Sequence, residues 1–431
     1  MKKIITLFVF LLFILYANAE NIEIDRPWYL AGEAMKVTVS IDRSPIAYAE
    51  LCDKEGLAAC TIFNLYEGNG TGIVELPSDI HSGYYQLNVY TRDHAKVYSC
   101  LVPVINVQHK SNADQIKWVK ITEKDTMSYP AILIANSDTD SLFSVQKSMF
   151  NCSKSVDLRE VEGHIIKAHI KNVLNDTIFH ANNIRPSLSI VGKQLHYFEG
   201  KMQNDTTAIF YTYGLHGKQP LVLSAASHTG KSLPIQMITP YECILPKKLP
   251  YLIFHYQRKE VEQRARDMQY HQFDITPEKK ETVIGEYSDA ATEEGVPLDY
   301  DPIYCGKGPD LSYNLDEYRQ FYTINEVLLE YVLLVKRATI DGVKQLVTRN
   351  RDEAYDKWPA MVFIDGMPVI DIERLLNYDA RRIHYINIYN DKYTFGKGIY
   401  KGIVSFISRS GRLTNYPPEP NVQYLVYEFP E

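Results

Sequence analysis

The segment 359–411 constrains the fold of this 431-residue chain more than any other part of it. Its pattern of apolar residues predicts, in this order, a buried strand, a tight turn, a short helix, an alternating strand, a loop rich in glycine and aromatic residues, and a final strand. These elements are expected at 360–364, 365–368, 372–377, 383–389, 393–402 and 403–408. Strands and helices mixed at such short spacing are typical of an α+β domain.

Length and composition indicate an ordinary folded protein of several domains. A chain of 431 residues is long enough for roughly two to four domains. Apolar residues make up 45% of it and charged residues 23%, as in globular proteins. The formal net charge is −7 and no cluster of basic residues stands out, so nucleic acid is not expected as a partner.

The first 19 residues have the pattern of a secretory signal peptide. Lys2 and Lys3 precede an apolar stretch at 4–16, and Ala-Asn-Ala at 17–19 is typical of a cleavage site. The apolar stretch is too short to span a bilayer as a helix. We therefore expect an exported protein. No transmembrane segment is expected after signal cleavage.

The cysteines suggest free thiols more than a local disulfide, although an exported protein can form disulfides. Cys52 and Cys60 flank a turn at 53–56, and hairpin pairing around that turn places Cys52 opposite Leu57. Cys60 then lies about 10 Å further along its strand, beyond the reach of a disulfide. Buried free thiols, or a pairing with Cys100, are favoured over a bridge between these two cysteines.

Two regions have the short alternating strands and frequent turns of antiparallel β-sandwiches. The first is expected at 20–110 and the second at 157–246, with a strand-containing connecting segment at 111–156. A helix-compatible and then acidic linker is expected at 247–303, and an α+β domain at 304–431. The predicted fold class is therefore multidomain, with all-β sandwiches followed by an α+β domain.

The start of the α+β domain carries two local signals. Thr323 and Glu326 form a capping box, which predicts a helix at 326–332. Strands are expected at 334–340 and 343–347, joined by the Asp-Gly turn that is typical of a tight hairpin. The domain is thus predicted to begin with a helix and a hairpin.

The sequence contains no recognisable catalytic, metal-binding or cofactor-binding motif. Cys305 lies between glycines but lacks the Gln partner of a reactive thioester. Residues 230–232 (Gly-Lys-Ser) lack the preceding glycine of a phosphate-binding loop, since Ala225 occupies its place. His164 and His169, five residues apart, fall on opposite faces of one strand, so a zinc site is not expected. No catalytic, cofactor or metal residue is assigned, and the chain is not expected to be an enzyme.

Two parts of the chain resemble known modules. Residues 24–33 (Ile-Asp-Arg-Pro-Trp-Tyr-Leu-Ala-Gly-Glu) and 83–87 (Gly-Tyr-Tyr-Gln-Leu) resemble a macroglobulin-like domain, the sandwich repeated in alpha-2-macroglobulin and complement proteins. The segment 359–411 contains IDGMPV early and YKGIVSFISRSG late. That order resembles the plug domain that closes TonB-dependent outer-membrane receptors. Only residues 412–431 follow it, so we expect a plug-like domain without a barrel.

Together with the predicted signal peptide, these features resemble a family of Bacteroidetes envelope proteins. Proteins of that family carry macroglobulin-like domains followed by a barrel-less plug-like domain. The resemblance implies an envelope location, periplasmic or associated with the outer membrane, with display on the cell surface as the alternative. It also implies protein partners, and it implies no catalytic residues. Residues 281–284 (Glu-Thr-Val-Ile) also resemble the TonB box, a short segment that engages the energy-coupling protein as an added strand. A solvated linker is the alternative for this segment.

We therefore expect a non-enzymatic exported envelope protein that binds or scaffolds an outer-membrane barrel complex, a transporter or a secretion translocon, through its plug-like domain. The candidate contacts are Tyr389, Tyr393, Phe395 and Tyr400, because aromatic side chains are favoured anchors at interfaces. The equal alternative is that these aromatics cover the domain's own core. Two other functions remain open, a surface-displayed binding protein for peptides, glycans or host proteases, and an uncharacterised enzyme.

Overall fold

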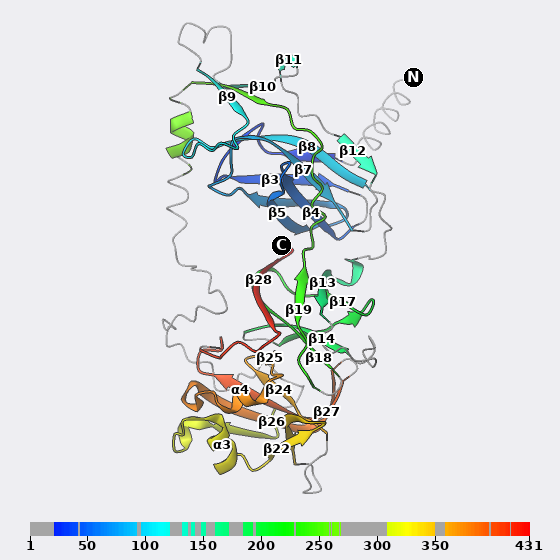
Figure 1. Cartoon of the computed structure of the whole chain (residues 1–431), viewed down its shortest axis with the longest axis vertical. Coiled ribbons are helices and arrows are strands. Elements are labelled where there is room, and N and C mark those ends of the chain that lie inside the picture. The colour runs from blue at the N-terminus through cyan, green and yellow to red at the C-terminus, as the bar shows by residue number, and fades with distance from the viewer. Residues whose placement is uncertain are drawn as a thin grey trace, which may run out of the picture.

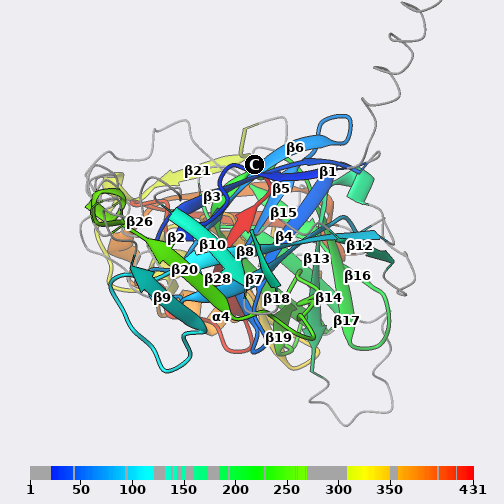
Figure 2. The ribbon, with the colours of Figure 1, turned by 90° about the horizontal axis from the view of Figure 1, so that it is seen from above.

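The computed structural model arranges the chain as three units in a row along its longest axis (Figure 1). Seen along that axis, the elements of the three units project onto one another (Figure 2). The structure describes residues 21–41, 44–92, 96–120, 160–171, 184–192, 195–227, 230–257, 259, 261–266, 268, 308–349, 358–395, 398–413 and 415–431, and the backbone of 132–136, 139–142 and 148–151. The predicted signal peptide, Cys152, Cys305 and residues 281–284 lie outside the described residues.

The first sandwich packs two sheets face to face, one with the order β1-β3-β6 and one with the order β12-β8-β7-β4-β5, beside which β2 pairs with β8. Apolar residues alternate along β3, so that Met35, Val37 and Val39 face the core between the sheets. The strands are β1 (Asn21–Ile24), β2 (Tyr29–Leu30), β3 (Ala34–Ser40), β4 (Ile46–Cys52), β5 (Leu57–Asn64), β6 (Asn69–Glu75), β7 (Gly83–Tyr90), β8 (Lys96–Ile105) and β12 (Ser148–Asn151).

Strand β4 connects the first sandwich to its neighbour, because every one of its residues is buried. Ala47 and Leu51 face the core of the first sandwich. Ile46 and Tyr48 face the other way, into a second core that also contains residues of the next unit. A strand covered on both faces is mostly apolar instead of alternating, and Glu50 is the one charged residue of β4.

A small sheet with the order β11-β10-β20-β9 packs on the first sandwich. Strand β20 comes from the region predicted to be a linker, and it pairs in parallel with β9. Phe254 is fully buried there, with Trp28 and Trp118 each 5.4 Å from its ring. The predicted linker therefore starts too early, because this short apolar run is a strand. The four strands are β9 (Ile116–Lys120), β10 (Ile132–Asn136), β11 (Thr139–Leu142) and β20 (Leu252–Tyr256).

A helical stretch at 261–266 follows β20 and is tied to the first sandwich by one arginine. The Arg264 guanidinium donates to both carboxylate oxygens of Glu33, at 2.7 and 2.6 Å. It also lies 3.8 Å from the centre of the Trp28 ring. The helix-compatible sequence predicted here is thus helical, and it belongs to the first unit.

The second sandwich pairs a sheet of order β16-β17-β13-β19 with one of order β15-β14-β18-β28. Its core contains residues such as Ile166, Leu188, Phe210 and Leu223. The elements are η1 (Glu160–Glu162), β13 (His164–Ile170), β14 (Ile184–Ile190), β15 (His196–Glu199), β16 (Lys201–Met202), β17 (Thr207–Thr212), β18 (Gly217–Ser227), β19 (Ile235–Ile238) and β28 (Gln423–Phe429).

The α+β unit contains a sheet of order β21-β26-β27-β24-β25 and a separate two-stranded sheet, β22-β23. Helices α3 and α4 share one apolar cluster with these strands. The elements are β21 (Leu311–Asn314), η3 (Leu315–Glu317), α3 (Ile324–Glu330), β22 (Val335–Ile340), β23 (Val343–Thr348), β24 (Met361–Ile364), β25 (Met367–Pro368), α4 (Ile372–Leu376), η4 (Ala380–Arg382), β26 (Ile383–Phe395) and β27 (Gly398–Ser408).

The two local signals at the start of this unit are confirmed. The Thr323 side chain accepts a hydrogen bond from the Glu326 amide, and the Glu326 carboxylate accepts one from the Thr323 amide. Helix α3 starts two residues earlier than predicted. Strands β22 and β23 pair antiparallel, and Asp341 and Gly342 between them have positive φ angles of 50° and 77°, as a tight hairpin turn requires.

In the α+β unit, the predicted loop at 393–402 is wrong. The glycine- and aromatic-rich loop expected at 393–402 is part of a long hairpin, in which Tyr393 pairs with Tyr400 and Phe395 pairs with Gly398. Aromatic residues are favoured in strands, and here they prolong β26 and β27 beyond the core of the sheet. The glycines favour a loop, whereas Gly402 (φ 97°) lies in β27 at a shift in the register between β26 and β27.

The last strand crosses a predicted boundary. The α+β domain was expected to extend to Glu431, but β28 pairs along its whole length with β18 of the second sandwich. In Figure 1 it lies in the middle of the molecule. The Asn64 amide of the first sandwich also donates to the Glu431 carbonyl oxygen at 2.9 Å. The chain therefore returns from the terminal unit to the middle one. In the described part of the chain, no helix has the length and apolar character needed to cross a membrane.

Candidate functional site

Three of the four predicted contact aromatics, Tyr389, Tyr393 and Tyr400, lie at an interface within the chain. Tyr389 has no exposed surface, and it packs with Met361, Phe363 and Ile403. Tyr393 and Tyr400 pack against the same cluster and are partly buried. The side chain of Phe395 lies outside the described residues. Tyr389, Tyr393 and Tyr400 thus pack with Met361, Phe363 and Ile403 of their own unit and also with residues of the second sandwich.

The surface that they help to cover belongs to the second sandwich. Leu195 and Tyr197 of that unit pack on the cluster, and the Tyr197 ring lies edge-on to Phe363 at 5.9 Å. The Arg185 guanidinium lies 5.8 Å from the centre of the Tyr400 ring. We call this contact between the second sandwich and the α+β unit the second junction.

The turn after β24 completes the second junction. Asp365 and Gly366 have φ angles of 46° and 82°, and the Gly192 amide donates to the Asp365 carbonyl oxygen at 3.3 Å. A Cβ on Gly366 would lie 3.5 Å from the carbonyl oxygen of Ile190. The turn therefore packs directly against the end of β14, where positive φ angles favour glycine.

The Asp365 side chain joins the early and late halves of the segment 359–411. Its carboxylate accepts hydrogen bonds from the amide and the hydroxyl of Ser408, at 2.8 and 2.6 Å, and from the Leu413 amide at 2.9 Å. Burial raises the pKa of Asp365, and these hydrogen bonds only partly offset that effect. Asp365 of the Asp-Gly turn and Ser408, which begins the Ser-x-Ser-Gly sequence at 408–411, thus form one contact in the fold.

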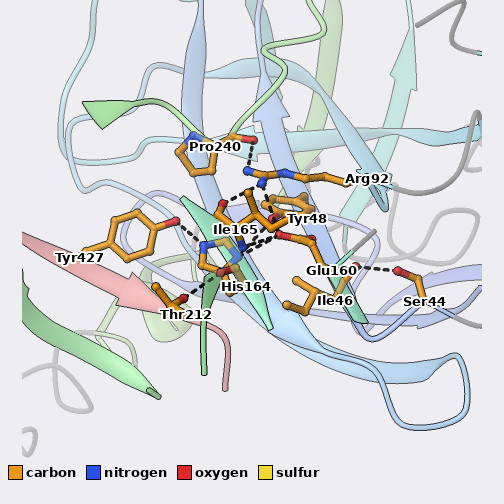
Figure 3. A network of polar contacts seen from close by, with 10 residues as sticks. All are labelled: Ser44, Ile46, Tyr48, Arg92, Glu160, His164, Ile165, Thr212, Pro240 and Tyr427. Atoms are coloured by element: carbon orange, nitrogen blue, oxygen red, sulfur yellow. Dashed lines mark hydrogen bonds and ion pairs between the residues drawn. The ribbon is translucent and has the colours of Figure 1, made fainter. Parts of the chain in front are cut away.

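A second set of polar side chains is buried between the two sandwiches, and Figure 3 shows it. At its centre the Glu160 carboxylate oxygen Oε1 accepts hydrogen bonds from the Tyr48 hydroxyl at 2.6 Å and from the Ile165 amide at 3.0 Å. The Arg92 guanidinium lies 3.3 Å from the same oxygen. Tyr48 and Arg92 belong to the first sandwich and Glu160 to the second. We call this contact the first junction.

His164 and Tyr427 complete the first junction, in which Arg92 makes a second contact. Arg92 donates to the Ile165 carbonyl oxygen at 2.7 Å. His164 Nδ1 lies 3.2 Å from Glu160 Oε1, and its Nε2 lies 2.7 Å from the Tyr427 hydroxyl. We assign the His164 proton to Nδ1, because the carboxylate can only accept a hydrogen bond and the tyrosine hydroxyl can donate one. Tyr427 belongs to β28, so the last strand also enters this junction.

The electrostatics of the first junction favour a neutral histidine beside an ionised carboxylate. Burial lowers the pKa of His164, although the hydrogen bond to Glu160 opposes this. Burial would raise the pKa of Glu160, but the hydrogen bond from His164 and the charge of Arg92 outweigh it, so that its pKa falls below the usual 4.5. The ion pair between Glu160 and Arg92 is therefore retained in the interior.

Glu50 of β4 makes a separate buried contact with the chain that leaves the second sandwich. It has no exposed surface, and its carboxylate accepts hydrogen bonds from the backbone amides of Glu242, Cys243 and Ile244, at 2.6, 3.2 and 3.2 Å. The Tyr90 hydroxyl donates to it as well. Three amides converging on one carboxylate hold the segment 242–244 against the first sandwich.

The first junction has catalytic residue types, but its placement favours a structural role. Tyr48, His164 and Tyr427 are all buried, and each is used in a contact between elements of the protein. A catalytic base must reach a substrate proton, and buried groups paired with one another do not. Within the described residues, no group of three or more His, Cys, Asp or Glu side chains could hold a metal ion.

Sequence reasoning missed both Glu160 and His164. The prediction that His164 and His169 fall on opposite faces of one strand is confirmed, because His164 is buried and His169 is exposed. A polar residue on the inward face of an otherwise apolar strand was the available signal. Its partners Tyr48 and Tyr427 are 116 and 263 residues away, so spacing could not identify them.

The described cysteines are free thiols, as favoured from sequence. Cys52 pairs with Leu57 in the hairpin register, which confirms the expected offset from Cys60. Burial raises the pKa of Cys52 to about 12 and also raises that of Cys60. A thiol that resists ionisation is a poor nucleophile, so neither is a candidate catalytic residue.

An open groove with a mostly apolar lining is formed by residues of α3, the β22-β23 hairpin and α4. Helix α3 and strand β22 lie at the end of the molecule opposite the first sandwich (Figure 1). We name this open groove the hairpin groove. Its volume is about 470 Å³. Leu329 and Leu333, at its rim, are 60% and 68% exposed, unusually high values for leucine. Its apolar residues are Leu328, Leu329, Val332, Leu333, Val335, Ala338, Ile372 and Leu376.

The charged residues of the hairpin groove are mostly basic. Lys336, Arg337 and Lys344 line it together with a single acidic residue, Glu373. Lys344 and Glu373 form an ion pair at 2.8 Å. The groove is therefore locally basic on a chain whose formal net charge is −7.

Comparisons with known proteins show no family for this chain. No family model matches it, and no curated protein does. Among solved structures it is similar to a trypsin-activated alpha-2-macroglobulin from Escherichia coli, with 8% identity and a TM-score of 0.19 over 52% of this chain and 16% of that one.

Two other solved structures are similar to the chain at still lower TM-scores. A putative adhesin from Bacteroides ovatus gives 14% identity and a TM-score of 0.10, over 45% of this chain and 76% of that one. The Enterococcus faecalis protein ACE, described as binding its ligands by a collagen hug, gives 8% identity and a TM-score of 0.09, over 55% and 94%. Similarities this slight carry no inference about function.

Proposed function

We propose that this chain is a non-enzymatic exported envelope protein that docks on an outer-membrane barrel complex, a transporter or a secretion translocon, through its α+β unit. In this proposal the α+β unit is a plug-like domain and the first sandwich is macroglobulin-like, as the sequence resemblance implies. The two sandwiches act as a stalk, and the protein works from the periplasmic side of the outer membrane.

One observation carries the proposal: the hairpin groove is an open surface with a mostly apolar lining, formed in part by α3 and β22 at the end of the molecule farthest from the first sandwich (Figure 1). Exposed leucines that line a groove are typical of a binding surface. The predicted aromatics, by contrast, are used at the second junction. The contact surface is therefore assigned to the groove and no longer to Tyr389, Tyr393 and Tyr400.

The junctions support the stalk. Buried, hydrogen-bonded contacts between units resist bending more than a flexible linker does. Glu160 and Arg92 join the two sandwiches, and Asp365 and Gly192 join the second sandwich to the α+β unit. A groove at the end of such a stalk is held at a fixed distance from the first sandwich.

The test is affinity capture of the full chain from detergent-solubilised envelopes, with identification of co-purifying proteins by mass spectrometry. The doubly substituted variant Leu329→Asp/Leu333→Asp should lose a barrel protein that the parent chain recovers, because it places charge in the apolar groove. Tyr66→Asp is the matched control, since Tyr66 is 81% exposed on the first sandwich. Equal recovery of the barrel protein by parent and groove variant, or no barrel protein with either, would contradict the proposal.

A further inference from the structure

The backbone beside the hairpin groove belongs to an edge strand. In the described part of the chain, β22 pairs only with β23. Arg337 and Thr339 on β22 are exposed. An edge strand presents backbone N–H and C=O groups to which another strand can add. The position of the edge matters here, because the groove is lined by residues of this same strand.

The pairing pattern identifies which backbone groups point outward. The tight turn at 341–342 makes Ile340 and Val343 the closing hydrogen-bonded pair. Alternate residues of an antiparallel strand bond to the partner strand, so Ala338 and Lys336 face β23 and Thr339 and Arg337 face away from it.

Two hydrogen bonds at the other end of the hairpin agree with this assignment. The Arg349 amide donates to the Leu334 carbonyl oxygen at 2.8 Å, which continues the series of residues that face the partner strand. The Val335 amide bonds instead to the Val332 carbonyl oxygen at 3.3 Å, away from β23. Thr339 and Arg337 therefore offer N–H and C=O groups on the outer edge.

The groove lies on the face of the hairpin that an added strand would share. Val335 and Leu346 belong to the apolar cluster that also contains residues of α3 and α4. A strand placed beside β22 would direct every second side chain to that face, on the side of the hairpin where Leu329 of α3 lies. Its apolar residues would enter the groove while its backbone pairs with Arg337 and Thr339.

The charged residues of the hairpin groove determine which added strand is favoured. Three cations and one anion line the groove, so acidic residues on the added strand are favoured. A second copy of this chain fits poorly, because β22 against another β22 would oppose basic side chains, which is destabilising in cross-strand positions. Lysine and arginine on an edge strand are also a known protection against self-association.

We propose that the hairpin groove captures an extended acidic peptide segment of a partner protein, which adds to β22 as a strand and places alternate apolar side chains in the groove. The inference rests on the proposed docking function, which it deepens by naming the form of the recognised segment. Main-chain pairing supplies affinity and the groove supplies selectivity, as in other complexes formed by strand addition.

The test measures binding of a labelled peptide to the full-length mature chain by fluorescence polarisation. The probe is a peptide of about seven residues that alternates Glu with Val or Leu. We expect saturable binding below about 1 mM that weakens as salt is added. The same peptide with Lys in place of Glu should bind more than about tenfold more weakly. A third peptide, N-methylated at alternate backbone amides, should bind similarly weakly because it cannot pair with the edge.

Variants of the chain separate strand addition from simple apolar contact. Thr339→Pro removes an outward N–H without removing a bond to β23, so peptide binding should weaken about two- to tenfold while the thermal transition is retained. Thr339→Val keeps the N–H and is the matched control. Leu329→Asp should abolish binding. Absence of peptide binding below 1 mM, or binding that neither N-methylation nor Thr339→Pro weakens, would overturn the proposal.

The outcome is distinguishable from that of the docking function. If peptide binding follows the expected pattern but no barrel protein co-purifies, strand addition stands and the barrel partner is wrong. If a barrel protein co-purifies equally with parent and Thr339→Pro chains and the peptide does not bind, docking stands and strand addition is overturned.

Discussion

The two junctions join neighbouring units by opposite means. The first junction, between the sandwiches, is centred on the ion pair of Glu160 and Arg92 with a neutral His164 beside it. The second junction, between the second sandwich and the α+β unit, is an apolar cluster around Phe363 and Tyr389. The difference teaches that one chain can hold its units together by hydrogen-bonded charge at one end and by apolar contact at the other.

The largest effect is expected at the first junction from Arg92→Ala. The substitution leaves the Glu160 carboxylate buried without its cation, which costs about 3–5 kcal/mol when a buried pair is broken. Urea denaturation followed by circular dichroism measures it. Arg381→Ala is the control, because its partner Asp379 lies at the surface, and its stability should stay close to that of the parent chain. A comparably small effect of Arg92→Ala would show that the ion pair does not hold the sandwiches together.

At the second junction, Met361→Ala should cost about 2–5 kcal/mol, since it leaves a cavity in the apolar cluster. The loss should be nearly the same at acidic and neutral pH, because no charge is removed. The matched control is Ile73→Ala, which removes an apolar side chain that is 58% exposed and should change stability by less than about 0.5 kcal/mol. A loss at Met361 that depends strongly on pH would contradict the distinction between the junctions.

The pH dependence of the first junction has a definite sign. The folded pKa of His164 is lowered from 6.5, so the unfolded chain binds the extra proton first as the pH falls. Its stabilising contribution is complete above pH 6.5 and is lost as the pH falls through the lowered pKa. Glu160, whose pKa is lowered from 4.5, acts with the same sign at lower pH. Stability measured across this range should fall less steeply with acid in His164→Gln than in the parent chain. Identical profiles would exclude His164 as a titrating group.

The Asp365 carboxylate, whose hydrogen bonds to Ser408 and Leu413 lie within the α+β unit beside the second junction, should respond to pH with the opposite sign, and this effect is the smallest. The folded pKa of Asp365 is raised from 3.8, so the folded chain keeps the proton longer as the pH rises. Its contribution is complete below pH 3.8 and is lost as the pH rises through the raised pKa. Relative to the parent chain, Asp365→Asn should lose this decline with rising pH. Acid–base titration of stability in both proteins would show it, and a parallel pair of curves would contradict it.

The parts of the fold that were predictable from sequence are those with local causes. The capping box at Thr323, the turn at 341–342 and the order of strand, turn and helix from Ala360 to Leu376 follow from short-range chemistry. The prediction of a multidomain, mostly β protein with sandwich-like units also holds, because alternating apolar residues give strands their buried face.

The missed features depend on residues that are distant in sequence. Strand β20 pairs with β9, although more than a hundred residues separate them, and Glu160 joins Tyr48 across 112 positions. The sequence predicts a loop around Tyr393 and Tyr400, because the glycines of this segment favour a loop more strongly than its aromatic residues favour strands. Tyr389 packs inside the protein because the second sandwich lies against its cluster. No local sequence pattern predicts where the second sandwich lies.

The return of β28 imposes an order on folding. Its partner β18 ends at Ser227, whereas β28 begins only at Gln423. As the chain is made from its N-terminus, the first sandwich and the hairpin groove can form while the middle unit still lacks a strand and the Tyr427 hydroxyl that meets His164. The middle unit is therefore the last to close. Until β28 is in place, β18 pairs with β14 on one side and has an unpaired edge on the other, to which a wrong strand can add.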